Sequence, residues 1–144
     1  MKSRTFIRKI EFLALGLLLL ALLVVPVVAP PDIQFFPTVA EPGPSMQALN
    51  SGFLVNEGGC LRLWYFGESS LLIWPYGYSY RTSWSRIEVL DENGEVIARS
   101  GTFVRLAGGE TTQRGFNTFI EKTGQEPPPG CNGPYWVVGG VAND

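Results

Sequence analysis

The chain has 144 residues, of which 45% are hydrophobic, and it carries 11 basic side chains, 13 acidic side chains and no histidine. Without histidine it lacks the commonest general base and the commonest zinc ligand, and two cysteines cannot complete a four-ligand structural zinc site. Four basic and one acidic side chain lie in the first 29 residues, so the remaining 12 acidic and 7 basic side chains leave a net charge of −5. We therefore expect no metal, no cofactor and no nucleic-acid partner.

Residues 1–29 have the pattern of a membrane-targeting segment. Four basic residues among the first nine precede a nearly continuous apolar run, Phe12–Ala29. As a helix this run would be about 27 Å long, close to the ~30 Å of a bilayer's hydrocarbon core. No further Lys or Arg occurs before Arg62, so the positive-inside rule predicts a cytoplasmic N-terminus and a C-terminal domain outside. The expected location is the cell membrane, with a single pass.

The same segment has alternatives. Val27-Val28-Ala29 offers the small-residue pattern of a signal-peptidase site, but Pro30 and Pro31 follow it directly and should hinder cleavage. The run is also longer than an ordinary signal-peptide core. An uncleaved signal anchor is therefore the leading interpretation. Secretion after signal cleavage is one alternative, and a buried helix of a soluble domain is another.

Residues 30–46 are expected to be a linker. Five prolines fall between Pro30 and Ser45, which favours extended polyproline conformation. At ~3.1 Å per residue such a stalk could hold the following domain up to ~50 Å from the bilayer.

Residues 47–144 are expected to form one extracytoplasmic β-domain. Short apolar runs separated by turn residues predict strands at Gly52–Val55, Cys60–Phe66, Leu71–Trp74, Ile87–Leu90, Val96–Ala98, Phe103–Leu106 and Tyr135–Val138. The residues 56–59, Asn-Glu-Gly-Gly, predict a hairpin between the first two strands. Asn93-Gly94 predicts a two-residue type I′ turn, so the strands from Ile87 to Leu106 are expected to form a three-stranded meander.

One segment has a helical period instead. Phe116, Phe119 and Ile120 fall at i, i+3 and i+4, which predicts one or two helical turns within Thr112–Lys122. The expected fold class is therefore mainly all-β: a small antiparallel β-barrel or sandwich of about six or seven strands with one short helix, preceded by the N-terminal hydrophobic helix.

The order of these elements, with a helix after the third or fourth strand and before the last, is similar to the oligonucleotide/oligosaccharide-binding (OB) barrel. The chain also resembles a group of small exported bacterial β-barrel domains of unknown function. The resemblance covers roughly residues 51–139. Its residues are Gly59-Cys60-Leu61, Leu72–Pro75, Gly94, Gly108-Gly109, Cys131 and Gly133–Trp136. It implies a fold and export, and no activity.

The two cysteines, Cys60 and Cys131, are expected to form one disulfide if the chain is exported to an oxidising compartment. Free buried thiols are an alternative. A redox-active pair is a further one, but it would more typically be C-x-x-C beside a histidine or a helix start.

Aromatic residues are concentrated between Trp64 and Trp84. Trp64, Phe66 and Trp74 are expected in the core of a small barrel. In extended chain Tyr76, Tyr78 and Tyr80 would point the same way, and with Trp84 and Arg81 they form the candidate ligand-binding set.

These observations predict a membrane-anchored or exported protein that is not an enzyme, with a binding or structural domain that presents an aromatic surface to a protein or glycan at the cell envelope. A carboxylate-dependent hydrolase of the envelope is the alternative, using residues such as Glu88 and Glu110, but alternation with apolar neighbours places Glu88 on a solvent face. An OB-like binder of single-stranded nucleic acid is a further alternative, disfavoured by the charge.

Overall fold

The computed structural model describes residues 31–43 and 46–142. Within them the chain forms eight strands and one helix, namely β1 (Ala48–Glu57), β2 (Cys60–Tyr65), β3 (Glu68–Ile73), β4 (Ser79–Ser83), β5 (Arg86–Leu90), β6 (Val96–Arg99), β7 (Phe103–Thr111), α2 (Gln113–Thr123) and β8 (Tyr135–Val141). The predicted mainly-β class with one short helix is confirmed, with one strand more than the upper expectation. The hydrophobic helix predicted within residues 1–29 lies outside the described residues.

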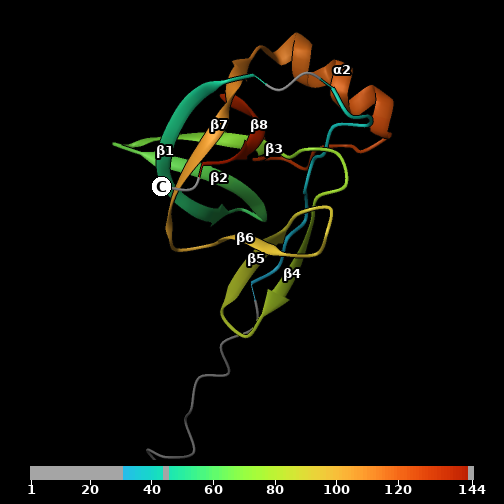
Figure 1. The fold of residues 1–144 in the computed structure, drawn as a ribbon. Coiled ribbons are helices and arrows are strands. Elements are labelled where there is room, and N and C mark those ends of the chain that lie inside the picture. Colours follow the sequence, from blue (N-terminus) through green and yellow to red (C-terminus); the bar gives the residue numbers. More distant parts are fainter. Residues whose placement is uncertain (1–30, 44–45, 143–144) are drawn as a thin grey trace, which may run out of the picture.

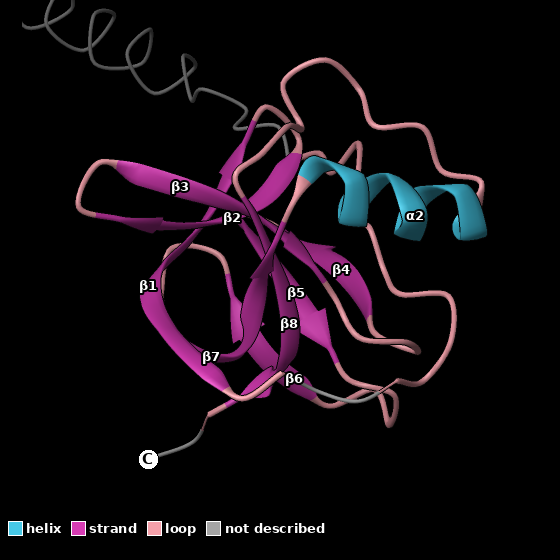
Figure 2. Ribbon diagram, turned by 90° about the horizontal axis from the view of Figure 1, so that it is seen from above, coloured by secondary structure: helices cyan, strands magenta, loops and turns pink. Residues whose placement is uncertain are grey.

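Five strands close into a barrel in the order β1-β2-β3-β8-β7, and β7 pairs back onto β1 (Figures 1 and 2). Four of the five pairings are antiparallel, whereas β3 and β8 run parallel, with Leu71 opposite Tyr135. A parallel pair requires a long crossover, which the chain from β4 to α2 supplies. The helix α2 precedes β8, the last barrel strand, as the spacing predicted.

The remaining strands form a separate three-stranded sheet, β4-β5-β6, at the end of the barrel opposite α2 (Figure 1). The predicted meander therefore has the wrong third member. Phe103–Thr111 pairs with β1 and β8 of the barrel, and β4, for which no strand was predicted, takes its place beside β5. An apolar run indicates that a strand exists, but it does not specify which neighbour the strand will pair with.

The two predicted hairpin turns differ in outcome. Gly58 and Gly59 both have positive φ, and they join Glu57 to Cys60 in a two-residue turn, which confirms the hairpin that residues 56–59 predicted. At the second turn the type I′ prediction is wrong, because only Gly94 has positive φ. The loop is longer, and the carboxylate of Asp91 accepts hydrogen bonds from the backbone N–H groups of Asn93 and Glu95, at 2.9 and 2.8 Å. Because the Asp91 side chain accepts from these backbone N–H groups, a longer loop forms in place of the predicted two-residue turn.

The core has two parts. The barrel interior is filled by buried residues that include Leu54, Leu63 and Trp74. The second part lies beneath α2, where the ring of Phe116 stacks on that of Tyr135 at 4.2 Å. The helix begins at Thr112, whose side chain accepts a hydrogen bond from the backbone N–H of Gly115, so the apolar face that the sequence predicted is anchored at its start.

Residues 31–39 run along the domain and belong to its core. Ile33, Phe35 and Pro37 are buried. The backbone N–H of Trp74 donates to the carbonyl of Pro37, and that of Val39 donates to the carbonyl of Trp74. The expectation of a free stalk is therefore wrong for this part of the linker. Proline favours an extended backbone, but it does not prevent the alternate apolar side chains from being buried.

Candidate functional site: an aromatic surface on the barrel

The three tyrosines of the predicted binding set do not line up along one strand. Tyr76 is exposed in a turn before β4, where the backbone N–H of Tyr78 donates to the carbonyl of Pro75. The turn breaks the period-two alternation on which the prediction depended.

Tyr80 packs against the segment that precedes the barrel, and Tyr78 packs against Trp74. The ring of Tyr78 stacks on Trp74 at 6.4 Å, Trp74 stacks on Phe36 at 5.7 Å, and Phe36 meets Tyr80 at 5.1 Å. The Tyr80 hydroxyl also donates to the carbonyl oxygen of Ile33 at 3.4 Å. Burial, and then the nearby carboxylates, raise the pKa of Tyr78. These contacts give both tyrosines a packing function, and those of Tyr80 hold residues 33–36 against the domain.

Arg81 is engaged within its own sheet. Its guanidinium donates to a carboxylate oxygen of Glu88 at 2.6 Å, and Arg99 donates to the other oxygen at 3.0 Å. Hydrogen bonds from Arg81 and then Arg99 lower the pKa of Glu88. A general acid in hydrolysis needs a raised pKa, so this environment suits a structural carboxylate. Glu110 lies on β7, a strand of the barrel, and not in the sheet that holds Glu88.

The fifth member of the predicted set, Trp84, is at the tip of the β4–β5 hairpin. Its side chain is 92% exposed. It follows Ser83, which is paired with Arg86, so Trp84 and Ser85 form a two-residue turn. Trp84 is thus separated from Tyr78 and Tyr80, whose rings pack at the other end of the strand.

Two of the three aromatic residues expected in the core are on the surface instead. Trp74 is fully buried, as predicted, but Trp64 is 43% exposed and Phe66 is 84% exposed. The correction follows from alternation along β2. Leu63 points into the barrel, so its neighbour Trp64 must point out of it.

Trp64 belongs to a row of aromatic side chains that crosses three barrel strands. Phe53 on β1 is opposite Trp64 on β2 and opposite Phe103 on β7. Ring centroids are 6.5 Å apart for Phe53 and Trp64, and 5.5 Å apart for Phe53 and Phe103. All three side chains are exposed by between 43% and 55%. We call Phe103, Phe53 and Trp64 the aromatic row. At the end of β2, the ring of Tyr65 packs edge to face on that of Phe66 in the following turn, with ring centroids 4.4 Å apart.

Sequence reasoning missed this row for a physical reason. Phe53 stands next to Leu54, and Phe103 next to Val104, so each strand offers two apolar neighbours that face opposite ways. In the structure Leu54 and Val104 are buried. Only strand pairing shows that the outward-facing members come from neighbouring strands and meet.

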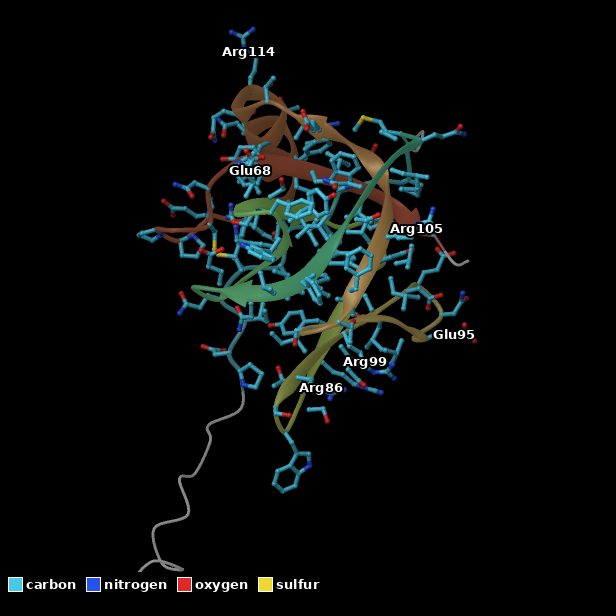
Figure 3. The ribbon with its side chains drawn as sticks, turned by 90° about the vertical axis from the view of Figure 1, so that its left-hand side faces the viewer. Glu68, Arg86, Glu95, Arg99, Arg105 and Arg114 are labelled. Atoms are coloured by element: carbon cyan, nitrogen blue, oxygen red, sulfur yellow. A yellow bond between two sulfur atoms is a disulfide. The ribbon has the colours of Figure 1, made fainter. Side chains whose placement is uncertain are left out.

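The row adjoins a shallow hollow. About 380 Å³ in volume, it is lined by β6, by the start of β7 and by Val141-Ala142, and Phe103 and Arg105 are among its lining residues. Figure 3 shows the side of the barrel that carries the β2–β3 hairpin, with Glu68 and Arg105 on either side of β1. The aromatic row thus has polar and charged neighbours at its margins, as binding surfaces commonly do.

The disulfide is present as predicted. Cys60 and Cys131 are bonded and buried, so the alternative of free thiols is wrong. The bridge ties the first hairpin of the barrel to the loop before β8. Beside it the buried guanidinium of Arg62 donates to the carbonyl oxygens of Asn132 and Ser69, each at 2.8 Å. A buried, well-tied bridge suits a structural function better than thiol exchange.

Comparison of the chain with protein-family models, with curated proteins and with solved structures finds no match. In the part of the chain that the structure describes, no helix is long and apolar enough to cross a membrane. Residues 31–43 and 46–142 contain no group of three His, Cys, Asp or Glu side chains that could hold a metal ion.

Proposed function

We propose that this protein is a membrane-anchored or exported binding module whose barrel presents the aromatic row to a protein partner outside the cytoplasm. The observation that carries the proposal is the row itself: three large apolar side chains, half exposed and in register on neighbouring strands. Large exposed aromatic groups are uncommon on monomers and are enriched at the centres of interfaces. The disulfide is compatible with an oxidising compartment.

The inclination of the rings favours a protein over a glycan. Phe53 and Trp64 are tilted by 48°, and Phe53 and Phe103 by 81°. A flat platform would suit the face of a sugar ring, whereas these rings make an uneven surface that suits apolar side chains of a protein. Covering the exposed halves of three such rings would remove roughly 300 Å² of apolar surface from water, about 7 kcal/mol before the costs of association. Contacts at the polar margin are therefore needed as well.

The two alternatives from the sequence have less support. The hydrolase hypothesis depends on Glu88 as a catalytic carboxylate, but its two arginine partners lower its pKa. The hypothesis of a nucleic-acid binder depends on the OB-like order of the strands and helix, but the chain after residue 29 has a net charge of −5, which disfavours binding to phosphates. Neither hypothesis explains why aromatic side chains lie together on the outside of the barrel.

The test compares two variants of the full-length chain in which the replaced aromatic side chains are similarly exposed. A photo-reactive amino acid at Ser51, on the same strand as Phe53, would cross-link the partner in native membranes. Phe53→Ser combined with Trp64→Ser should reduce the cross-linked product about tenfold or more, because central aromatic side chains dominate binding energy. Tyr76→Ser, which removes an exposed aromatic ring outside the row, should leave it unchanged.

Equal cross-linking by both variants would refute the aromatic row as the binding surface, and loss only in Tyr76→Ser would restore the surface predicted from sequence. Circular dichroism must show that each variant is folded. If wild type yields no protein cross-link but binds a defined glycan, and loses it in the double variant, the partner class is wrong and the surface is right.

A further inference from the structure

The tip of the β4–β5 hairpin carries Trp84, the most exposed of the large hydrophobic side chains in the part of the chain that the structure describes. All five residues of β4 are exposed, and the strand ends in a turn whose first residue is Trp84. Within the described chain, no aromatic ring packs on the Trp84 side chain, which is 92% exposed. An isolated indole at the end of a hairpin is free to insert into a lipid bilayer or to bind another protein.

The backbone at this tip does not favour tryptophan. Trp84 has φ of 28°, a positive value that glycine or asparagine adopts far more readily than a bulky side chain. The backbone conformation of the turn therefore does not explain why tryptophan is at this position. A strained, exposed aromatic residue at such a position points to a function for its side chain.

The hairpin lies at the end of the domain where the described chain begins. Ile33 is held by the Tyr80 hydroxyl on β4, and the carbonyl of Asp32 accepts a hydrogen bond from the Asn56 side chain at 3.1 Å. Trp84 is four residues farther along the hairpin from Tyr80, or ~13 Å in extended chain. Figures 1 and 3 show this tip at the same end of the molecule as residue 31, pointing away from the barrel.

The position of the apolar run makes this end of the domain the one nearest the predicted membrane span. Phe12–Ala29 ends two residues before Pro31, and residues 31–39 are packed against the domain. If Phe12–Ala29 spans the bilayer, no long stalk separates the domain from the lipid surface. The hairpin tip and the end of the span would then be close to the same headgroup region.

The charge of the hairpin also suits lipid headgroups. Arg81 and Arg99 pair with a single carboxylate, Glu88, and Arg86 lies two residues before it on β5, so this sheet carries more basic than acidic side chains although the chain after residue 29 is acidic overall. Arg86 is exposed next to the tip, as Figure 3 shows, while Glu95 lies away from it. Exposed Asp32 near the start of the described chain is the acidic group on the other side. Tryptophan with arginine is the pairing that proteins place at membrane–water interfaces.

We propose that the β4–β5 hairpin tip, with Trp84 and Arg86, lies in the headgroup region of the bilayer and fixes the orientation of the barrel on the membrane. This inference rests on the proposed membrane anchorage. It goes beyond that anchorage because it assigns a second, independent lipid contact to the folded domain. With the tip against the bilayer, the aromatic row on the side of the barrel would remain open to a partner.

The experiment uses the full-length chain in nanodiscs of phosphatidylcholine and phosphatidylglycerol, some of which are brominated close to the headgroup. Bromine quenches tryptophan only on close approach. We expect quenching in wild type, retained quenching in Trp64→Phe, and its loss in Trp84→Phe. Trp74 and Trp136 are buried and supply a constant background in every variant. Because Trp84 makes so few contacts, Trp84→Phe should fold normally, which circular dichroism would check.

An alkaline wash of the membranes separates this inference from the anchorage. Protein that resists the wash but shows no bromine quenching, or equal quenching in Trp84→Phe, overturns the lipid contact and leaves the anchorage intact. Protein that is washed out overturns both. A photo-reactive amino acid at Ser85 should form adducts with lipid, and adducts with protein alone would show that the tip contacts a protein instead.

Discussion

Replacing Phe66 by asparagine should stabilise the domain although it removes a large apolar side chain. Phe66 and Gly67 form the two-residue turn between Tyr65 and Glu68, with φ of 45° and 89°. A left-handed conformation costs an L-residue roughly 1–2 kcal/mol, and asparagine tolerates it better than phenylalanine. The lost edge-to-face contact with Tyr65 is worth about 0.5–1 kcal/mol, and little burial is lost because Phe66 is 84% exposed.

The expected net gain from Phe66→Asn is therefore about 0.5–1 kcal/mol. For a domain of this size that corresponds to a rise in Tm of about 2–8 °C. Thermal unfolding followed by circular dichroism, with the disulfide intact, would measure it. Phe66→Ala is the matched control, since it removes the same ring but retains a residue that disfavours positive φ, and it should give no stabilisation. A lower Tm for Phe66→Asn than for wild type would refute the reasoning that this turn is strained.

Three further predictions concern the interior and the charges. Replacing both cysteines by alanine should lower the free energy of unfolding by about 4 kcal/mol, because the bridge closes a loop over a separation of 71 residues, and urea unfolding would measure the loss. Gly108→Ala should cost about 3 kcal/mol or prevent folding, since its Cβ would overlap the carbonyl oxygen of Val137; soluble protein of unchanged urea midpoint would contradict this. The pKa of Glu88 is lowered on folding, so its stabilisation is present above the unfolded pKa, near 4.5, and is lost as pH falls through the folded pKa. Glu88→Gln should flatten the fall in Tm below pH 5, and an unaltered acid profile would exclude this carboxylate as its source.

Local chemistry was sufficient where a few neighbouring residues decide the structure. The hairpin at Gly58-Gly59 follows from the positive φ that its two turn positions require. The helix follows from the spacing of Phe116, Phe119 and Ile120. The loop at Asp91 is the exception, because a side chain competed for the same backbone donors.

Predictions that depended on the pairing of strands distant in sequence were wrong. The strand at Phe103 was recognisable, but its partners are β1 and β8 and not the strand that precedes it. The prolines after Pro30 predicted a stalk, whereas Ile33 and Phe35 are buried, and their burial depends on surfaces contributed by distant strands. The same limit applies to the predicted binding set, since density in sequence did not show that Tyr80 packs on Phe36 and donates to the carbonyl oxygen of Ile33.

The sequence by itself determined the mainly-β class, the positions of most strands and turns, the helix before the last strand and the availability of two cysteines for a bridge. These features depend on alternation, on backbone conformation and on composition, which act over a few residues. Only the tertiary structure decided which side of each strand faces water. Barrel closure turned Leu54 inward and Phe53 outward, and it brought Phe53 between Trp64 and Phe103. A surface made from three strands distant in the chain exists only once their register is set.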